Sequence, residues 1–294
     1  MQTAEIAQHF RIEHPDKFRL RDCDPAGTGV LANDKDAFKE MLAAAAKRLG
    51  KLQERLYAEG HWSVLVILQG MDASGKDGII EHVLSGVNPQ GCDVRSFKRP
   101  SAEELAHDFL WRTTLRLPER GRIGIFNRSY YEEVTVVRVH PEFLDAQKLP
   151  PSLIGDDVWK QRYEDIVAFE RHLARNGTVV LKFFLNMSQR EQSKQLLERL
   201  EDPEKHWKFN SGDLNERALW DKYMAAYEDA IRNTSRPEAP WYVVPADNKW
   251  FSRLVVAGAV VDAIERLNPQ FPGLGAKDRA MLEEMKKQLR ADER

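Results

Sequence analysis

Hydrophobic residues along the chain alternate between a helical period and short continuous runs. From residue 34 to 60, leucine and phenylalanine recur at helical spacing between an aspartate start and a glycine stop, which predicts a helix. Residues 62–68 (WSVLVIL) then form an apolar run typical of a strand buried on both faces of a parallel sheet. The pattern continues, with helices predicted over 75–87, 101–117, 156–175, from 188, 213–233, 249–267 and 276–290, and strands over 93–97, 123–126, 178–185 and 241–244.

This alternation predicts an α/β fold, in which a five-stranded parallel sheet is covered by helices on both faces as a three-layer sandwich. We expect this domain over residues 34–270. Residues 1–33 show no convincing period and predict an N-terminal arm over the domain surface. Residues 188–215 are polar, mostly helical and inserted, which predicts a lid. Residues 271–294 are expected to form a charged C-terminal helix.

The composition is that of an ordinary globular protein, since 42% of the 294 residues are hydrophobic and 31% are charged. The formal net charge of −2 gives no general attraction to nucleic acid or to an anionic membrane, so we expect neither as a partner. Cys23 and Cys92 match no zinc or redox spacing and indicate reduced thiols in the cytoplasm. We expect no signal sequence, and no apolar run approaches the roughly 18 residues that span a bilayer.

Residues 70–76 (GMDASGK) fit the phosphate-loop pattern G-x-x-x-x-G-K, between an apolar strand and a predicted helix. In such a loop, glycines let successive backbone N–H groups converge on phosphate oxygens, and the helix N-terminus adds its positive end. Lys76 supplies a mobile positive charge. The alternative, a tight turn with an unrelated lysine, is disfavoured by the strand, motif and helix together. The predicted phosphate-binding positions are Gly70, Ala73, Ser74, Gly75, Lys76 and Asp77.

Three aspartates follow predicted strands, and two roles are open for each of them. Asp72 lies inside the loop, where phosphate repels a carboxylate unless a cation intervenes, so it is a candidate Mg²⁺ ligand or a base that orients the attacking phosphate. Asp77 replaces the usual metal-binding hydroxyl; it is a phosphate-site residue or a helix N-terminal acid favoured by the dipole. Asp247 is a nucleotide contact or a helix cap.

A second polar cluster follows the strand predicted over 123–126. Asn127 occupies the position of the usual Walker B acid and is suited to hold a metal ion through water, without bringing charge. Arg128 follows, and its fork suits two phosphate oxygens. Glu132 lies one helical turn on, where a solvated acidic face with Glu133 is the alternative. The predicted catalytic residues are Asp72, Lys76 and Arg128, and Lys98 and Arg112 are predicted to contact phosphate from strand or helix ends.

Together, these motifs resemble the polyphosphate kinase 2 family over roughly residues 35–270. Asn127 with Glu132 is similar to the class III branch, because the other branches carry Asp at the position of Asn127. Tyr130 departs from the histidine that is frequent in this branch, and Arg99 fills a variable position. The resemblance rests on residues 70–78 (GMDASGKDG), 96–105 (SFKRPSAEEL), 107–112 (HDFLWR), 126–134 (FNRSYYEEV), 206–210 (HWKFN) and 240–250 (PWYVVPADNKW).

The resemblance implies a thymidylate-kinase-like P-loop core with a helical lid. It also implies phosphoryl transfer between inorganic polyphosphate and nucleotides, with Mg²⁺ or Mn²⁺ as cofactor. Class III members phosphorylate AMP to ADP and ADP to ATP, and homodimers or homotetramers are expected. Asp72 and Lys76 match the essential pair of the loop, and Asn127, Arg128 and Glu132 match the second motif. In the lid, the candidates for binding polyphosphate are Arg190, Lys194, Arg199 and Lys208.

Two other functions compete with this one. An ATP-dependent nucleoside monophosphate kinase shares the loop, but Asp77 and Asn127 argue against it. A P-loop binding or regulatory module is disfavoured by the intact Asp72, Lys76 and Arg128. Because no histidine lies in a convincing nucleophile context, we expect direct transfer without a phosphohistidine.

Overall fold

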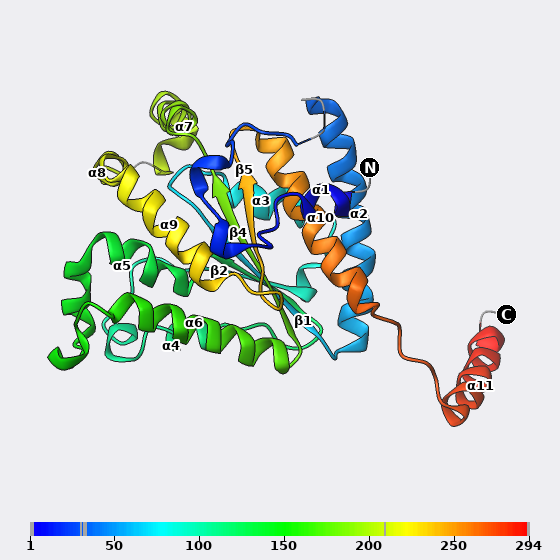
Figure 1. Cartoon of the computed structure of the whole chain (residues 1–294). Helices are drawn as coiled ribbons and strands as arrows, with labels where there is room; N and C mark the ends of the chain where they lie inside the picture. Colours follow the sequence, from blue (N-terminus) through cyan, green and yellow to red (C-terminus); the bar gives the residue numbers. More distant parts are fainter. Residues whose placement is uncertain (1–2, 30, 32–33, 209, 293–294) are drawn as a thin grey trace.

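The computed structural model describes residues 3–29, 31, 34–208 and 210–292. A five-stranded, wholly parallel sheet forms its centre, with the strand order β2-β3-β1-β4-β5. All five strands lie where the hydrophobic pattern predicts them, so the predicted α/β fold is confirmed (Figure 1). The strands are β1 Ser63–Gln69, β2 Cys92–Ser96, β3 Ile123–Asn127, β4 Thr178–Asn186 and β5 Trp241–Pro245.

Helices cover both faces of the sheet, and a separate apolar cluster fills each of the two layers between helices and sheet (Figure 1). Strand β1 is buried along its whole length, which explains its continuous apolar sequence. On one face lie α1 Thr3–Gln8, α2 Lys35–Glu59, α3 Lys76–Val83 and α10 Lys249–Leu267. On the other lie α6 Val158–Arg175, α9 Trp220–Thr234 and the 3-10 helix η5 Tyr130–Val134.

The ends of α2 follow the predicted signals. The Asp34 carboxylate accepts hydrogen bonds from the backbone N–H groups of Asp36 (3.0 Å) and Ala37 (3.1 Å). At the other end, Gly60 adopts the left-handed conformation at φ 69° and closes the helix. Local sequence therefore sets both bounds of this helix.

The N-terminal segment differs from the aperiodic arm expected from the sequence, because it contains α1 and is tied to the core. Ile6 is 1% exposed within the cluster that α10 helps to form. The backbone N–H of Ile12 donates to Trp241 O (2.8 Å), and that of Val243 donates to Phe10 O (2.9 Å), beside the edge strand β5. Parts of the predicted arm (1–2, 30 and 32–33), lid (209) and C-terminal helix (293–294) lie outside the described residues.

The helix predicted over 101–117 is wrong, because the chain forms two short elements there. Ser101 and Glu104 make the predicted capping box, with Glu104 N–H donating to Ser101 Oγ (3.2 Å) and Ser101 N–H to Glu104 Oε2 (2.8 Å). The Asp108 carboxylate then accepts from the N–H of Leu110 (2.9 Å), a local bond that competes with helix continuation. The resulting elements are η4 Glu104–Ala106 and α4 Trp111–Thr114.

The inserted region stands at the carboxyl edge of the sheet (Figure 1). The Ser188 hydroxyl accepts from the N–H of Glu191 (3.1 Å) and begins α7 as predicted. The long helix predicted over 213–233 is instead divided at Leu219 into α8 and α9. The inserted elements are α7 Gln189–Glu201, η8 Pro203–Lys208 and α8 Asp213–Ala218.

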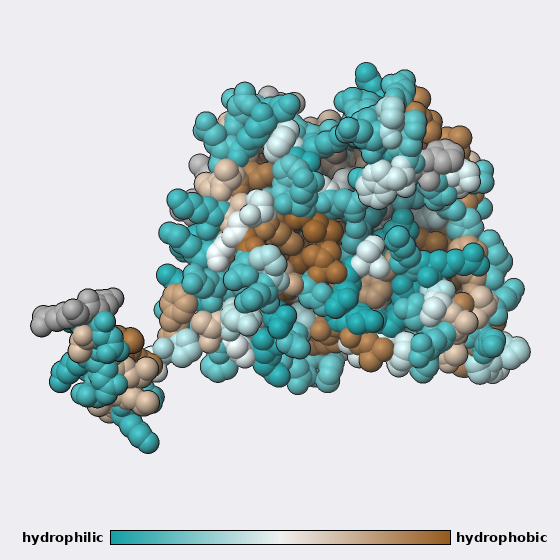
Figure 2. Space-filling view, turned by 180° about the vertical axis from the view of Figure 1, so that it is seen from behind, coloured by the Kyte–Doolittle hydropathy of each residue, from teal (hydrophilic) through white to brown (hydrophobic). Residues whose placement is uncertain are grey.

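The C-terminal helix α11 Ala276–Asp292 stands apart from the body of the molecule (Figures 1 and 2). Within the described part of the chain, no helix combines the length and the apolar character that crossing a membrane requires. The remaining short elements are α5 Val136–Val139, η1 Pro15–Lys17, η2 Leu20–Asp22, η3 Pro89–Gly91, η6 Pro141–Gln147 and η7 Pro151–Leu153.

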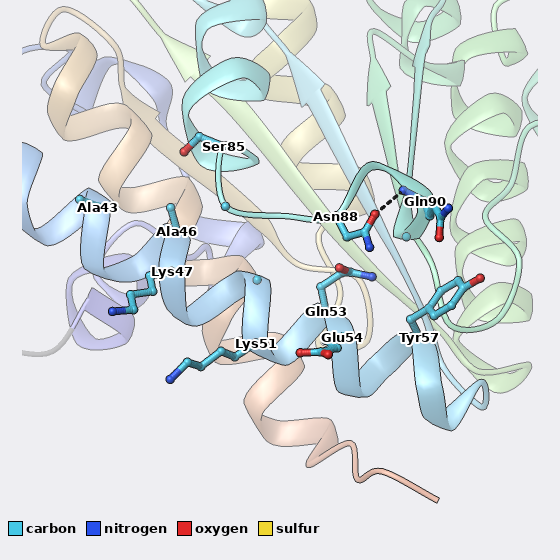
Figure 3. Close-up of a pocket in the computed structure, with 13 residues that line it drawn as sticks. Ala43, Ala46, Lys47, Lys51, Gln53, Glu54, Tyr57, Ser85, Asn88 and Gln90 are labelled. Carbon is cyan, nitrogen blue, oxygen red and sulfur yellow. Dashed lines mark hydrogen bonds between the residues drawn. The ribbon is translucent and has the colours of Figure 1, made fainter. Parts of the chain in front are cut away.

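A groove of about 620 Å³ lies between α2 and the turn from α3 to β2, at the amino edge of the sheet (Figure 3). The two segments approach backbone to backbone. A Cβ on Gly50 would lie 2.2 Å from Gly86 O, and a Cβ on Gly86 would lie 2.5 Å from Ala46 O. Glycine is therefore required at both positions by close contact. The predicted functional residues gather at the opposite, carboxyl edge.

Candidate active site

The phosphate loop connects the end of β1 to the start of α3. Gly70 (φ 150°) and Gly75 (φ 95°) have backbone angles that favour glycine, and Ala73 is left-handed at φ 69°. A Cβ on Gly70 would lie 2.8 Å from Ser74 Oγ, so a side chain there would clash. The predicted loop residues thus form one compact turn at a helix N-terminus, the geometry that suits phosphate.

Lys76 folds back over this loop and is only 8% exposed. Its Nζ donates to Gly70 O (2.7 Å), Met71 O (3.1 Å) and the Ser74 hydroxyl (3.4 Å). Burial, reinforced by the nearby Arg128, lowers the pKa of Lys76 to about 8. An anion bound in the loop would favour the charged lysine and oppose this shift.

Arg128 joins the loop to the second motif. Its NH2 group donates to Asp72 Oδ1 (2.5 Å) and its NH1 group to Glu132 Oε2 (3.3 Å). The carboxylate of Glu132, assisted by Asp72 and opposed by burial, raises the pKa of Arg128. Arg128 also has φ 64°, a region that arginine rarely adopts, and such strain is frequent at functional sites.

Glu132 is held from the sheet side by the last residue of β1. The Gln69 amide nitrogen donates to Glu132 Oε1 (2.9 Å), while the amide oxygen accepts from the N–H of Ser129 (3.1 Å). Burial raises the pKa of Glu132, and the neighbouring cations oppose this shift. Glu133 is buried, and Glu132, with 24% of its side chain exposed, is paired with Arg128, so these two glutamates do not form the solvated face that the sequence left open.

The side chains of Asn127 and Asp77 are hydrogen-bonded to each other. Asn127 Nδ2 donates to Asp77 Oδ1 (2.7 Å), which joins the end of β3 to the first turn of α3. No group of three or more His, Cys, Asp or Glu side chains within the described ranges could hold a metal ion. Asp72, with 29% of its side chain exposed beside the loop, fits a hard cation that takes most of its ligands from phosphate and water.

A cavity of about 550 Å³ opens from the loop. Asp72, Arg128 and Glu132 line it near the loop. Lys98 and Arg112 lie on its wall, where Arg112 NH2 donates to Lys98 O (2.8 Å). The cavity is polar at the loop and more apolar at its other end, which would suit the phosphate and the base of a nucleotide, respectively. What we call the apolar end is lined mainly by Leu105, Phe109, Val136, Val137, Phe143 and Ala146, with Glu104, Glu133 and Gln147 beside them.

The four basic lid residues do not line this cavity. Among the described residues that line the cavity, none belongs to this set. Lys194 and Arg199 each pair with a neighbouring carboxylate at 3.6 Å, Lys208 lies over an indole ring, and Arg190 is exposed. The structure therefore brings the loop and the second motif together and leaves the lid cations outside the cavity.

The lid nevertheless touches the loop through Gln192, which sequence reasoning missed. Its side chain is 1% exposed, and its Nε2 donates to Asp72 O (3.0 Å). Arg217 NH1, from α8, donates to Gln192 Oε1 (2.8 Å). A glutamine within a polar helix is not distinctive in the sequence, so the sequence carried no signal for this contact.

Asp247 is not the cap of α10, because Asn248 accepts from the first backbone N–H groups of that helix. Instead, Asp247 Oδ1 accepts from the N–H of Ser188 (2.7 Å). The loop after β5 thus anchors the base of α7. Asparagine is as good a cap as aspartate, so local sequence could not distinguish these neighbours.

The chain is similar to known proteins in sequence and in fold. The family described as Polyphosphate kinase 2 matches residues 32–272. The chain is 48% identical to an "ADP-polyphosphate phosphotransferase" of Rhodopseudomonas palustris, covering 96% of this chain and 98% of that protein. It is also 48% identical to an "AMP/ADP-polyphosphate phosphotransferase" of Meiothermus ruber, covering 90% and 94%. The crystal structure of polyphosphate kinase 2 from Arthrobacter aurescens TC1 superposes with a TM-score of 0.86 at 40% identity, covering 97% of each chain.

Proposed function

Because the chain belongs to the polyphosphate kinase 2 family, we propose that it moves phosphoryl groups between inorganic polyphosphate and nucleotides, phosphorylating AMP to ADP and ADP to ATP. Two similar proteins are named for polyphosphate transfer, one of them with both AMP and ADP. One observation supports the proposal above all: Asp72, Lys76, Arg128 and Glu132 lie close together beside one cavity.

The geometry supports direct transfer from donor to acceptor. We place the nucleotide in the cavity, with its base at the apolar end and its phosphate toward Arg128. Polyphosphate then lies over the loop beside Lys76. Phosphoryl transfer needs in-line positioning and neutralisation of oxygen charge, and little covalent chemistry from the protein. Lys76 and Arg128 supply that charge, and the Asp72 and Glu132 carboxylates hold the arginine fork in place.

A divalent cation, proposed to be Mg²⁺ with Mn²⁺ as a substitute, would complete the site. Asp72 would hold it from the protein side, with Asn127 contributing through a water molecule. When bound, such an ion neutralises and orients phosphate oxygens. Carboxylate oxygens such as those of Asp72 are the ligands that a hard cation prefers.

An ATP-dependent nucleoside monophosphate kinase remains the second candidate. Its loop would normally end in a serine or threonine that binds the metal ion. Here Asp77 fills that position and is engaged by Asn127 at 2.7 Å. This pair favours polyphosphate transfer over the ATP-dependent alternative.

We further propose that residues 188–215 act as a lid over bound polyphosphate. The contact of Gln192 with Asp72 supports this role, since it couples α7 directly to the loop. Closure would carry the exposed cations of the lid toward a polyanion, which would compete with the nearby carboxylates for them. The residues proposed for this contact are Arg190, Lys194, Arg199 and Lys208.

A homodimer or homotetramer is proposed for the assembled enzyme. Helix α11 exposes Met281 (62%), Met285 (51%) and Leu289 (64%), which share one face at a spacing of four residues. Sedimentation of the full chain and of a chain ending at residue 270 checks this proposal. A monomeric full chain would contradict it.

Transfer is tested with purified protein, Mg²⁺, long-chain polyphosphate and AMP or ADP, with the products separated by chromatography. Lys76→Ala and Asp72→Ala should each abolish transfer while leaving the fold intact, as checked by circular dichroism. Lys51→Ala, at an exposed lysine of the distant groove, is the matched control and should retain activity. Near-native activity in either site variant would show that the centre is misplaced, and turnover with ATP but not polyphosphate would favour the second candidate.

A further inference from the structure

A row of side chains runs along the lid side of the cavity, starting at the phosphate loop. The Tyr227 hydroxyl is hydrogen-bonded to the backbone of Gly70. Tyr223 lies one turn earlier on α9, and its hydroxyl donates to Glu216 Oε2 (2.5 Å). Both tyrosines and Glu216 line the cavity. The row therefore leads from the loop to a carboxylate on α8.

His140 lies behind the cavity lining and connects Glu216 to Phe143 at the apolar end. Its Nε2 lies 3.0 Å from Glu216 Oε2, and its ring stacks on Phe143 with the centroids 5.1 Å apart. Its Nδ1 lies 3.2 Å from Glu142 Oε1. Burial lowers the pKa of His140, but the bonds to Glu216 and Glu142 more than offset this and raise it. The ring is thus favoured as a donor to both carboxylates.

The two carboxylate oxygens of Glu216 differ in their contacts with the described residues. Oε2 receives both Tyr223 and His140, whereas Oε1 accepts no hydrogen bond from the described residues. The side chain is 35% exposed and faces the cavity. His140, between α5 and η6, and Tyr223, on α9, orient this carboxylate. The side chain of Glu216 has therefore already lost conformational freedom before any ligand binds.

The position of Glu216 along the row indicates which part of a nucleotide it meets. Phosphate belongs at the loop end and the base at the apolar end, so the ribose lies between them. A carboxylate would repel phosphate there, but it is a strong acceptor for hydroxyl groups. We propose that Glu216 binds the ribose hydroxyls of the acceptor nucleotide, and that His140 and Tyr223 are positioning residues for this contact. The inference rests on the nucleotide placement in the proposed function.

Titration calorimetry with ADP and with 2′,3′-dideoxy-ADP, in the absence of polyphosphate, tests this contact through the ratio of the two Kd values. The native chain should favour ADP by about 10-fold to 100-fold, the range for hydrogen bonds to a charged group. Glu216→Ala should bring the ratio close to one. Glu216→Gln and Tyr223→Phe, which keep the side-chain shape, should give intermediate ratios. A purely structural role would weaken both ligands equally and leave the ratio unchanged.

Tyr163→Phe is the matched control, since it removes the hydroxyl of a buried tyrosine that contacts Arg138 outside the cavity lining. It should keep the native ratio. A native ratio near one, or a native ratio retained in the Glu216 and Tyr223 variants, would overturn the proposal. Because calorimetry requires no phosphoryl transfer, loss of kinase activity and loss of ribose discrimination are separate outcomes.

Discussion

The buried lysine of the phosphate loop should make polyphosphate binding depend on pH. Lys76 is 8% exposed and its pKa is lowered to about 8, chiefly by burial and then by Arg128. At pH 8, about half of the unliganded molecules therefore carry a neutral amine. A polyanion placed beside Nζ favours the charged form, so binding should draw a proton from solution.

The size of this effect follows from the same pKa. Uptake should be about half a proton per chain at pH 8, close to zero at pH 6.5 and close to one at pH 9. The bound state holds more protons than the free state, so affinity falls as pH rises. Above pH 8 the loss should approach about tenfold per pH unit, equivalent to about 1.4 kcal/mol.

Titration calorimetry in two buffers of different ionisation enthalpy measures this uptake directly. Long-chain polyphosphate is the ligand, because its few terminal groups contribute little titration of their own. Lys76→Arg is the matched control, since a guanidinium stays charged throughout this range and should show no uptake at pH 8. Equal uptake by the native chain and the arginine variant would refute the role given to Lys76.

Three further predictions address stability and catalysis. Lys182→Met should lower the free energy of unfolding, measured in urea, by about 3–5 kcal/mol, because it leaves the buried Glu170 carboxylate without the ammonium group at 2.6 Å. Adding Glu170→Gln should recover most of this loss. Arg128→Ala should lower kcat by about 100-fold to 1,000-fold in the polyphosphate assay, because it removes the positive charge that stabilises the phosphoryl group during transfer. Tm should change by no more than a few degrees. Gly86→Ala should cost about 1–3 kcal/mol in urea because its Cβ would lie 2.5 Å from Ala46 O, and an unchanged midpoint would contradict the close approach.

The parts of the fold that the sequence predicts are those that neighbouring residues specify. Helix α10 has the predicted bounds, because an apolar period runs between Asn248 at its start and the left-handed Asn268 at its end. The loop over 70–76 is equally local, since its glycines, its lysine and the flanking strand and helix are contiguous. Parallel pairing then places Asn127 at the same edge as the loop.

The missed features depend on contacts between distant segments. Helix α1 has six residues, too few to show a period, and is stabilised by burying Ile6. Lys182 interrupts an apolar strand, and its partner Glu170 comes from α6, which no local pattern reveals. Glu216 resembles an ordinary surface acid in the sequence, and its contact with His140 depends on the tertiary fold.

Phosphorus NMR of a reaction that contains the purified chain, Mg²⁺, AMP and long-chain polyphosphate shows whether polyphosphate is the phosphoryl donor. We expect AMP to be converted to ADP and then to ATP. Each phosphoryl group gained by nucleotide should match one phosphate unit lost from the polymer. An unchanged polymer, with ADP formed only when ATP is supplied as donor, would show that polyphosphate is not the donor.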